Sequence, residues 1–123
     1  MNKKIDEIVI DGETYIPKNM VKGEVINTDG MKYVIVRTYS AGVFAGYLAK
    51  EEGQEVVLHK ARRLWKWSGA ASLSQLAMEG VKNPSDCKFP CETDIHKLKQ
   101  VIEIIDATPQ AKANIDNVPI WAA

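Results

Sequence analysis

Three strand-like runs separated by glycine-containing turns constrain the fold more than any other feature. The first run, Lys32 to Tyr39, is rich in valine, isoleucine and tyrosine, which favour strands. Its centre, Tyr33-Val34-Ile35-Val36, is apolar at every position and predicts a strand buried on both faces. The turn residues Ser40-Ala41-Gly42 follow, and Val43 to Ala49 returns as a second strand. Consecutive strands joined by short turns predict an antiparallel meander.

Glu55 to Trp67 forms the third run, after the turn Glu51-Glu52-Gly53. Because the side chains of a strand alternate between its faces, this run divides into two sets. Neither set is purely polar, so we expect contacts on both faces. One set is Val57, His59, Ala61, Arg63, Trp65 and Trp67, and the other is Val56, Leu58, Lys60, Arg62, Leu64 and Lys66.

Two short helices are predicted after the third strand. Ser72-Leu73-Ser74-Gln75 has the serine and glutamine spacing of a capping box, and Gly80 is placed to end the helix that it begins. Thr108-Pro109 is a second helix start, since threonine caps well and proline is tolerated in the first turn. This second helix should run to about Asp116.

The segments beside these helices are less regular. Cys87 to Asp106 fits both a helical stripe and a strand, and we favour a strand for Val101 to Ile105. Val118-Pro119-Ile120-Trp121 is predicted to be a final edge strand, where proline costs least.

An N-terminal hairpin is predicted over Ile5 to Pro17, because two apolar runs flank Asp11-Gly12, a dipeptide suited to a tight turn. Residues 1–30 are then the hairpin and its connection, and residues 31–123 are a single core domain. Runs of strands with helices appended predict an α+β fold. The expected architecture is a mainly antiparallel β-sheet with two short helices and an N-terminal β-hairpin.

Composition and charge limit the class of partner. Sixteen basic and sixteen acidic residues cancel, so the chain lacks the long-range positive field of a protein that coats nucleic acid. No apolar run approaches the roughly 20 residues that span a bilayer, and the N-terminus lacks a secretory signal. We therefore expect a cytoplasmic protein without membrane contact. Cys87 and Cys91 are predicted to be free thiols, since in a strand they lie beyond disulfide reach.

The segment from His59 to Ser72 carries the strongest indication of function. Between Val56 and Met78 there are four basic residues and no acidic one, so the local charge is +4 in a neutral chain. Such a segment suits an anion, and its two tryptophans suit a nucleobase. Arginines make bidentate contacts with phosphate, and the open N–H groups of a helix start bind phosphate oxygens.

These features together predict a nucleotide site. A base would stack on Trp65 or Trp67, and phosphate would lie between the arginines and the helix start. The neighbouring hairpin would close over the ligand. The predicted nucleotide-binding residues are Tyr39, Ser40, Phe44, Arg62, Arg63, Trp65, Trp67, Ser72 and Ser74.

Each of these residues also has a purely structural interpretation. Tryptophans commonly pack in cores, strand arginines commonly pair with surface acids, and Ser72 can act solely as a helix cap. Zinc binding by Cys87 and Cys91 with a histidine has weak support, because the CxxxC spacing is loose. The sequence lacks GxSxG and the GK[ST] ending of a P-loop, so no catalytic residue, metal or cofactor is predicted, and we do not expect an enzyme.

Three segments carry a resemblance: Val34 to Gly46 (VIVRTYSAGVFAG), Ala61 to Ala77 (ARRLWKWSGAASLSQLA) and Cys87 to Pro90 (CKFP). From Tyr33 to Trp121 the chain resembles a family of small phage-encoded proteins of unassigned function. That family is similar to phage anti-defence sponges, which sequester the cyclic nucleotide signals of bacterial CBASS or Thoeris immunity without cleaving them. The resemblance implies a cyclic di- or trinucleotide ligand, a homo-oligomer and action in the bacterial host cytoplasm.

The same residues would also fit other classes of protein. A phage structural or assembly protein would pack Trp65, Trp67 and Trp121 against a partner and would have no small-molecule ligand. A single-stranded nucleic-acid-binding protein would use the arginines and indoles in a continuous groove, with steep salt dependence. The neutral net charge makes nucleic acid the less expected partner. A nucleotide hydrolase would release products.

Overall fold

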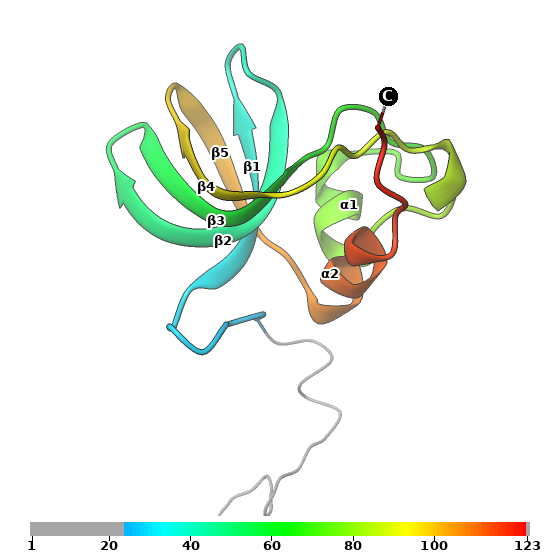
Figure 1. The fold of residues 1–123 in the computed structure, drawn as a ribbon, viewed down its shortest axis with the longest axis horizontal. Helices are drawn as coiled ribbons and strands as arrows, with labels where there is room; N and C mark the ends of the chain where they lie inside the picture. Colours follow the sequence, from blue (N-terminus) through cyan, green and yellow to red (C-terminus); the bar gives the residue numbers. More distant parts are fainter. Residues whose placement is uncertain (1–23, 123) are drawn as a thin grey trace, which may run out of the picture.

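The structure is a computed structural model that describes residues 24–122, so the predicted hairpin over Ile5 to Pro17 lies outside the described residues. The described chain forms a five-stranded sheet with two α-helices (Figure 1). The α+β prediction, with a mainly antiparallel sheet and two short helices, is confirmed. The elements are β1 (Lys32–Thr38), β2 (Val43–Glu52), β3 (Glu55–Arg63), α1 (Leu73–Glu79), the 3-10 turn η2 (Pro84–Asp86), β4 (Thr93–Leu98), β5 (Val101–Asp106) and α2 (Pro109–Asp116).

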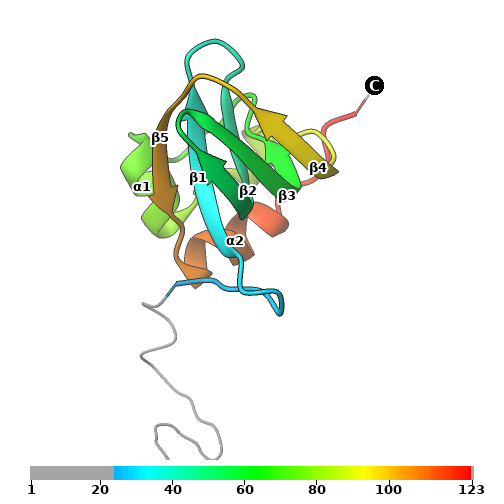
Figure 2. The ribbon, with the colours of Figure 1, turned by 90° about the vertical axis from the view of Figure 1, so that its left-hand side faces the viewer.

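The sheet has the strand order β4-β3-β2-β1-β5, and every neighbouring pair is antiparallel. Lys99 and Gln100 alone separate β4 from β5, although these strands are the two edges of the sheet. The sheet therefore curls, and the N–H of Val101 donates to the carbonyl of Gln54 in the β2–β3 turn at 2.9 Å. Figure 2 shows the curled sheet in front of both helices.

The core lies on both faces of this sheet. Val34 and Val36 of β1 point to its inner face, whereas Tyr33 and Ile35 point to the face that the helices cover, so the predicted burial of both faces is confirmed. The inner cluster is Val34, Val36, Phe44, Val56, Leu58, Ala61, Leu98 and Val101. The helix-side cluster is Tyr33, Ile35, Ala45, Leu64, Leu76, Ala77, Val81, Cys87, Phe89, Ala107, Ala111, Ile115 and Val118.

The alternation predicted along β3 is wrong beyond Lys60. Lys60 has a φ of 53°, and the register with β2 shifts between His59 and Arg62. A β-bulge of this kind adds one residue and reverses the faces of those that follow. Ala61 therefore joins the inner cluster, and Arg62 turns to the helix side. The strand also ends at Arg63, earlier than predicted.

Gly46 of β2 lies opposite the bulge, where the two strands approach closely. A Cβ atom at this position would lie 3.0 Å from the Cα of Ala61 and 3.2 Å from the carbonyl oxygen of His59. No side chain fits there without moving the backbone of β3. Because a bulge increases the local twist, the pair of Gly46 and the bulge supports the curl of the sheet.

Both helices begin as predicted. The Ser72 hydroxyl accepts a hydrogen bond from the N–H of Gln75 at 3.1 Å, and the Gln75 side chain accepts one from the N–H of Ala71. Thr108 caps α2 in the same way through the N–H of Ala111 at 3.1 Å. Gly80 ends α1 with a φ of 82°. In the part of the chain that the structure describes, no helix is long and apolar enough to cross a membrane.

Of the two predictions for the segments beside the helices, one is confirmed and one is wrong. The second half of the ambiguous stretch is a strand as favoured, since Val101 to Ile105 falls within β5. Val118 to Trp121 is not an edge strand, and this prediction is wrong. It makes one parallel bridge, Phe89 with Ile120, because α2 delivers the chain to the segment before β4 and not to a sheet edge.

Candidate ligand-binding groove

The structure brings part of the predicted site together at one end of the sheet. The N–H of Leu64 donates to the carbonyl of Val43 at 2.8 Å, and Phe44 lies opposite Arg63. The end of β3 therefore lies beside the β1–β2 turn, which carries Tyr39 and Ser40. Tyr39 is 77% exposed, and the Ser40 hydroxyl contacts the Gln100 side chain at 3.4 Å. Phe44 is buried in the inner cluster, and Trp65 is 63% exposed.

Arg62 lies inside the protein and binds backbone carbonyls. The residue is 7% exposed, and its guanidinium carbon lies 5.5 Å from the centre of the Phe89 ring. Burial lowers the pKa of Arg62 from its usual value, and no carboxylate lies within 4 Å of it among residues 24–122. Its donors are occupied by the carbonyl oxygens of Phe89 (3.0 Å), Pro90 (2.9 Å), Ile115 (2.8 Å), Val118 (2.8 Å) and Pro119 (3.1 Å).

The other predicted residues lie on the helix side. Trp67 is half-buried against the helix-side cluster, Ser72 is the cap of α1, and Ser74 is exposed on the first turn of that helix. Arg63, by contrast, stacks on Phe44 of the inner cluster. The nine predicted residues therefore do not converge on one pocket within the described chain.

An open groove lies beside the central basic segment and uses other residues. Lys66 and Lys88 face each other in an antiparallel bridge, in which the N–H of Lys88 donates to the carbonyl of Lys66 at 2.8 Å. Trp121 lies next to them, because its N–H donates to the carbonyl of Phe89 at 2.9 Å. We call this hollow of about 510 Å³ the Lys66–Lys88 groove; its lining is Lys66, Ser68, Ser85, Asp86, Cys87, Lys88 and Trp121.

The charge of the Lys66–Lys88 groove is positive. Like charges directly opposite each other in a bridge repel, and neither ammonium lies within 4 Å of a carboxylate among the described residues. Asp86 lines the same groove and offsets part of this charge. The ammonium of Lys88 lies 5.4 Å from the centre of the Trp121 ring, a cation–π distance. Trp121 is 46% exposed, so part of its surface is open to solvent.

The floor of the groove offers hydroxyl donors. The Ser68 oxygen accepts a hydrogen bond from the Asn83 side chain at 3.1 Å, which leaves its own O–H free to donate. The Cys87 thiol is buried between Ser68 and Asn83, and the N–H of Ser68 donates to its sulfur at 3.4 Å. Cys87 and Cys91 are both free, as predicted.

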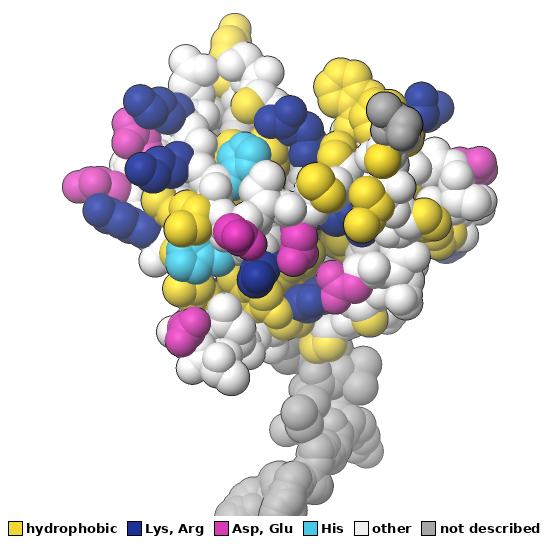
Figure 3. Space-filling model, in the orientation of Figure 1, with side chains coloured by type: hydrophobic (Ala, Val, Ile, Leu, Met, Phe, Trp, Pro, Cys, Tyr) yellow, Lys and Arg dark blue, Asp and Glu magenta, His cyan; other side chains and the backbone are white. Residues whose placement is uncertain are grey.

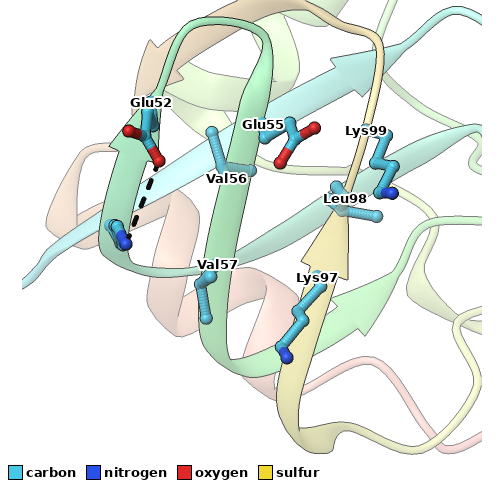
Figure 4. A pocket seen from close by; sticks show the side chains of 8 residues that line it. Glu52, Glu55, Val56, Val57, Lys97, Leu98 and Lys99 are labelled. Atoms are coloured by element: carbon cyan, nitrogen blue, oxygen red, sulfur yellow. Dashed lines mark ion pairs between the residues drawn. The ribbon is translucent and has the colours of Figure 1, made fainter.

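A second hollow lies at the β2–β3 turn and suits a nucleotide less well. Its cavity is about 110 Å³, and its side chains are aliphatic, acidic and basic without an aromatic ring (Figure 4). Lys50 and Glu52 form an ion pair across 4.0 Å, so part of its charge is satisfied internally. The lining residues are Lys50, Glu52, Glu55, Val56, Val57, Lys97, Leu98 and Lys99.

None of the seven residues that line the groove is among the nine predicted site residues, and most of them come from parts of the chain far from the basic segment. Lys88 lies in the segment before β4, and Trp121 was expected in an edge strand. Lys66 and Ser68, by contrast, belong to the basic segment already singled out. In Figure 3, hydrophobic side chains gather near the C-terminal end of the described chain, with basic side chains on either side.

The comparisons with known proteins identify the family alone. No curated protein and no solved structure matches the chain. Residues 31–115, which run from the start of β1 into α2 and include Lys66 and Lys88, match the family described as a domain of unknown function (DUF6948). The chain therefore belongs to the DUF6948 family.

Proposed function

We propose that this chain binds a nucleotide in the Lys66–Lys88 groove and does not cleave it. The observation that carries the proposal is the pair of opposed lysines beside an exposed indole. A phosphate that contacts both ammonium groups would neutralise two like charges that line the same groove. A base stacked on Trp121 would add about 1–3 kcal/mol.

The dimensions and donors of the groove fit this ligand. Its volume of about 510 Å³ lies within the range of small-molecule sites. The free O–H of Ser68 is a further donor for phosphate, and the Asp86 carboxylate is an acceptor for a sugar hydroxyl. Neither histidine lines the groove, and the hydrogen bonds of the Cys87 thiol hold it in the wall. These features favour binding over hydrolysis.

In its finer form the proposal is that the protein is a phage anti-defence sponge for a cyclic di- or trinucleotide. The sequence resemblance over Val34 to Gly46 and Ala61 to Ala77 supports this form. The chemistry of the groove supports it too, because a sponge needs stacking surfaces and phosphate donors but no nucleophile. Such a protein would act in the cytoplasm of the bacterial host as a homo-oligomer, since joined subunits build deeper pockets from short chains.

A thermal-shift screen tests the proposal. The purified chain is heated with cyclic di- and trinucleotides, cyclic ADP-ribose isomers and linear controls, and the ligand recovered afterwards is analysed by chromatography. We expect a saturable rise in melting temperature with intact ligand, because binding to the native state raises its stability. The variant Lys66→Gln/Lys88→Gln should lose the shift, and the matched control Lys97→Gln/Lys99→Gln should keep it. Products in place of ligand would contradict the proposal.

Exposed apolar side chains support a second candidate, a phage structural or assembly protein that binds a protein partner. Trp65, Ile120 and Trp121 are 63%, 63% and 46% exposed, and the segments that carry them are joined through Lys88 and Phe89. Adjacent exposed aromatic side chains are typical of an interface. If no nucleotide shifts the melting temperature while the protein forms stable complexes of defined size, this candidate replaces the first.

A further inference from the structure

We propose that Arg63 and His96 form a second site, separate from the Lys66–Lys88 groove, that binds a phosphate group at the end of the inner face of the sheet. The anomaly that points to it is the Nε atom of Arg63. This nitrogen is buried and has no hydrogen-bond partner among residues 24–122. Buried polar groups in native proteins almost always have a partner, such as a water molecule or an ion, so an unsatisfied one calls for an explanation.

Arg63 differs from the other two arginines, which both have partners. The chain contains three arginines, and all of them lie in the described part. Arg37 binds Glu103 with 3.0 Å between its Nε and the carboxylate, and Arg62 binds five carbonyl oxygens. Arg63 has neither kind of partner within the described residues. Its guanidinium is therefore the one whose bidentate donors are uncommitted.

Arg63 and His96 both contact the ring of Phe44. The guanidinium carbon of Arg63 lies 4.7 Å from the centre of the Phe44 ring, and the imidazole centre of His96 also lies 4.7 Å from it. Phe44 is buried, so both groups rest against the apolar inner cluster. The planar guanidinium offers its edge to an oxyanion in this arrangement.

Hydrogen bonding orients the second donor. Thr93 Oγ1 lies 3.0 Å from Nδ1 of His96 and 3.4 Å from the carbonyl oxygen of Ala61. With the Thr93 proton on that carbonyl, Nδ1 of His96 carries a proton, and Nε2 is the nitrogen left for a ligand. A bound phosphate would accept from Arg63 and from the protonated Nε2.

Within residues 24–122, neither Arg63 nor His96 has a carboxylate within 4 Å. Burial, and then the positive charge of Arg63, lower the pKa of His96 from its usual value. Asp94, the nearest acid along β4, pairs with Lys60 at 3.6 Å. An anion between Arg63 and His96 would offset the positive charge of Arg63 and attract a proton to the imidazole, so we expect its binding to raise the pKa of His96.

Histidine NMR gives a direct test, because the chain has two histidines and they lie on opposite faces of β3 and β4. His59 pairs with Ile95, and His96 pairs with Leu58 of the inner cluster. Inorganic phosphate is titrated at constant ionic strength, with sodium chloride as the balancing salt. We expect a saturable shift of the His96 ring signals and a raised His96 pKa, with His59 unchanged as the internal control.

Variants separate this site from other causes. Arg63→Gln should abolish the response of His96, and Arg63→Lys should weaken it, whereas Arg37→Gln and Lys66→Gln/Lys88→Gln should leave it intact. The far-ultraviolet spectrum and melting temperature of each variant confirm folding. Equal, unsaturable shifts of both histidines, or a full response in folded Arg63→Gln, would overturn the proposal. Loss of nucleotide binding in the groove would not affect it.

Discussion

Arg62 and Arg63 are adjacent arginines with opposite environments. Arg62 is buried among carbonyl oxygens, while Arg63 stacks at the end of the inner face. Five hydrogen bonds join Arg62 to the last turn of α2, to the segment before β4 and to the chain after α2. The carbonyls of Phe89 and Ile115 also accept from the backbone N–H groups of Trp121 and Val118. Within residues 24–122 the guanidinium is the donor that satisfies the carbonyls of Pro90, Val118 and Pro119.

Replacing Arg62 should therefore destabilise the protein strongly. Arg62→Met keeps most of the side-chain volume but leaves buried carbonyls without donors, and we expect it to lower the free energy of unfolding by about 3 kcal/mol or more. Arg37→Met, at an exposed arginine of β1 paired with Glu103, should cost less than about 1 kcal/mol. Urea denaturation of both variants measures the difference. Equal midpoints would show that the Arg62 hydrogen bonds contribute little.

The β-bulge at Lys60 decides which of the two arginines faces the helices and which faces the inner side of the sheet. Lys60 has a φ of 53°, a region that costs a non-glycine residue about 1–2 kcal/mol. Its side chain is exposed and approaches Asp94 at 3.6 Å, a surface pair of little energetic weight. The bulge thus carries local strain that the pairing of β2 and β3 maintains.

Lys60→Gly should relieve this strain. We expect an unfolding free energy equal to that of the wild type or higher by up to about 1 kcal/mol, because glycine adopts positive φ freely. Lys50→Gly, at an exposed lysine of β2 that has no positive φ, should instead lower the stability by about 0.5–1 kcal/mol. Thermal and urea unfolding compare the two. A loss in Lys60→Gly as large as in Lys50→Gly would contradict the strain at the bulge.

One asparagine of α2 binds the backbone just after the end of α1. Asn114 of α2 accepts from the N–H of Val81 at 2.6 Å and donates to its carbonyl at 2.7 Å. Gly80 leaves room for it, since a Cβ there would lie 2.5 Å from the Asn114 oxygen. Together these contacts fix the end of α1 against α2.

Asn114→Ala should lower the unfolding free energy by about 2 kcal/mol, because both backbone groups of Val81 lose their partner. Asn117→Ala, at the exposed end of the same helix, serves as the matched control and should change stability by less than about 0.5 kcal/mol. Chemical denaturation measures the change in unfolding free energy, and hydrogen exchange measures the protection of the Val81 amide. Unchanged protection of that amide would contradict the predicted role of Asn114.

Local signals explain what could be predicted of the elements. The caps at Ser72 and Thr108 depend on residues three positions away, and the turn at Gly42 lies within a few residues of both strands that it joins. The bulge at Lys60 is different, because it arises from the close approach of Gly46 on another strand. Arg62 and Arg63 could not be told apart from the sequence for that reason.

The Lys66–Lys88 groove depends on how distant segments of the whole chain come together. Three separate segments build it: the first carries Lys66 and Ser68, the second runs from Ser85 to Lys88, and the third contains Trp121. Arg62 joins the last two, because it donates to the carbonyl of Phe89, next to Lys88, and to that of Pro119, two residues before Trp121. The basic segment of the sequence predicts an anion site, and this stays a prediction. Its partners, Lys88 and Trp121, required the path of the chain after α2, which the edge-strand interpretation of Val118 to Trp121 misplaced.

Fluorescence of Trp121 tests binding in the groove most directly. The chain has three tryptophans, so Trp65→Phe/Trp67→Phe leaves Trp121 as the single indole. Titrating this protein with the cyclic di- and trinucleotides should quench Trp121 saturably, because a stacked base contacts its open face. Adding Lys66→Gln/Lys88→Gln should remove the quenching. Nucleotide binding that leaves Trp121 fluorescence unchanged, or quenching that survives loss of both lysines, would contradict the groove as the nucleotide site.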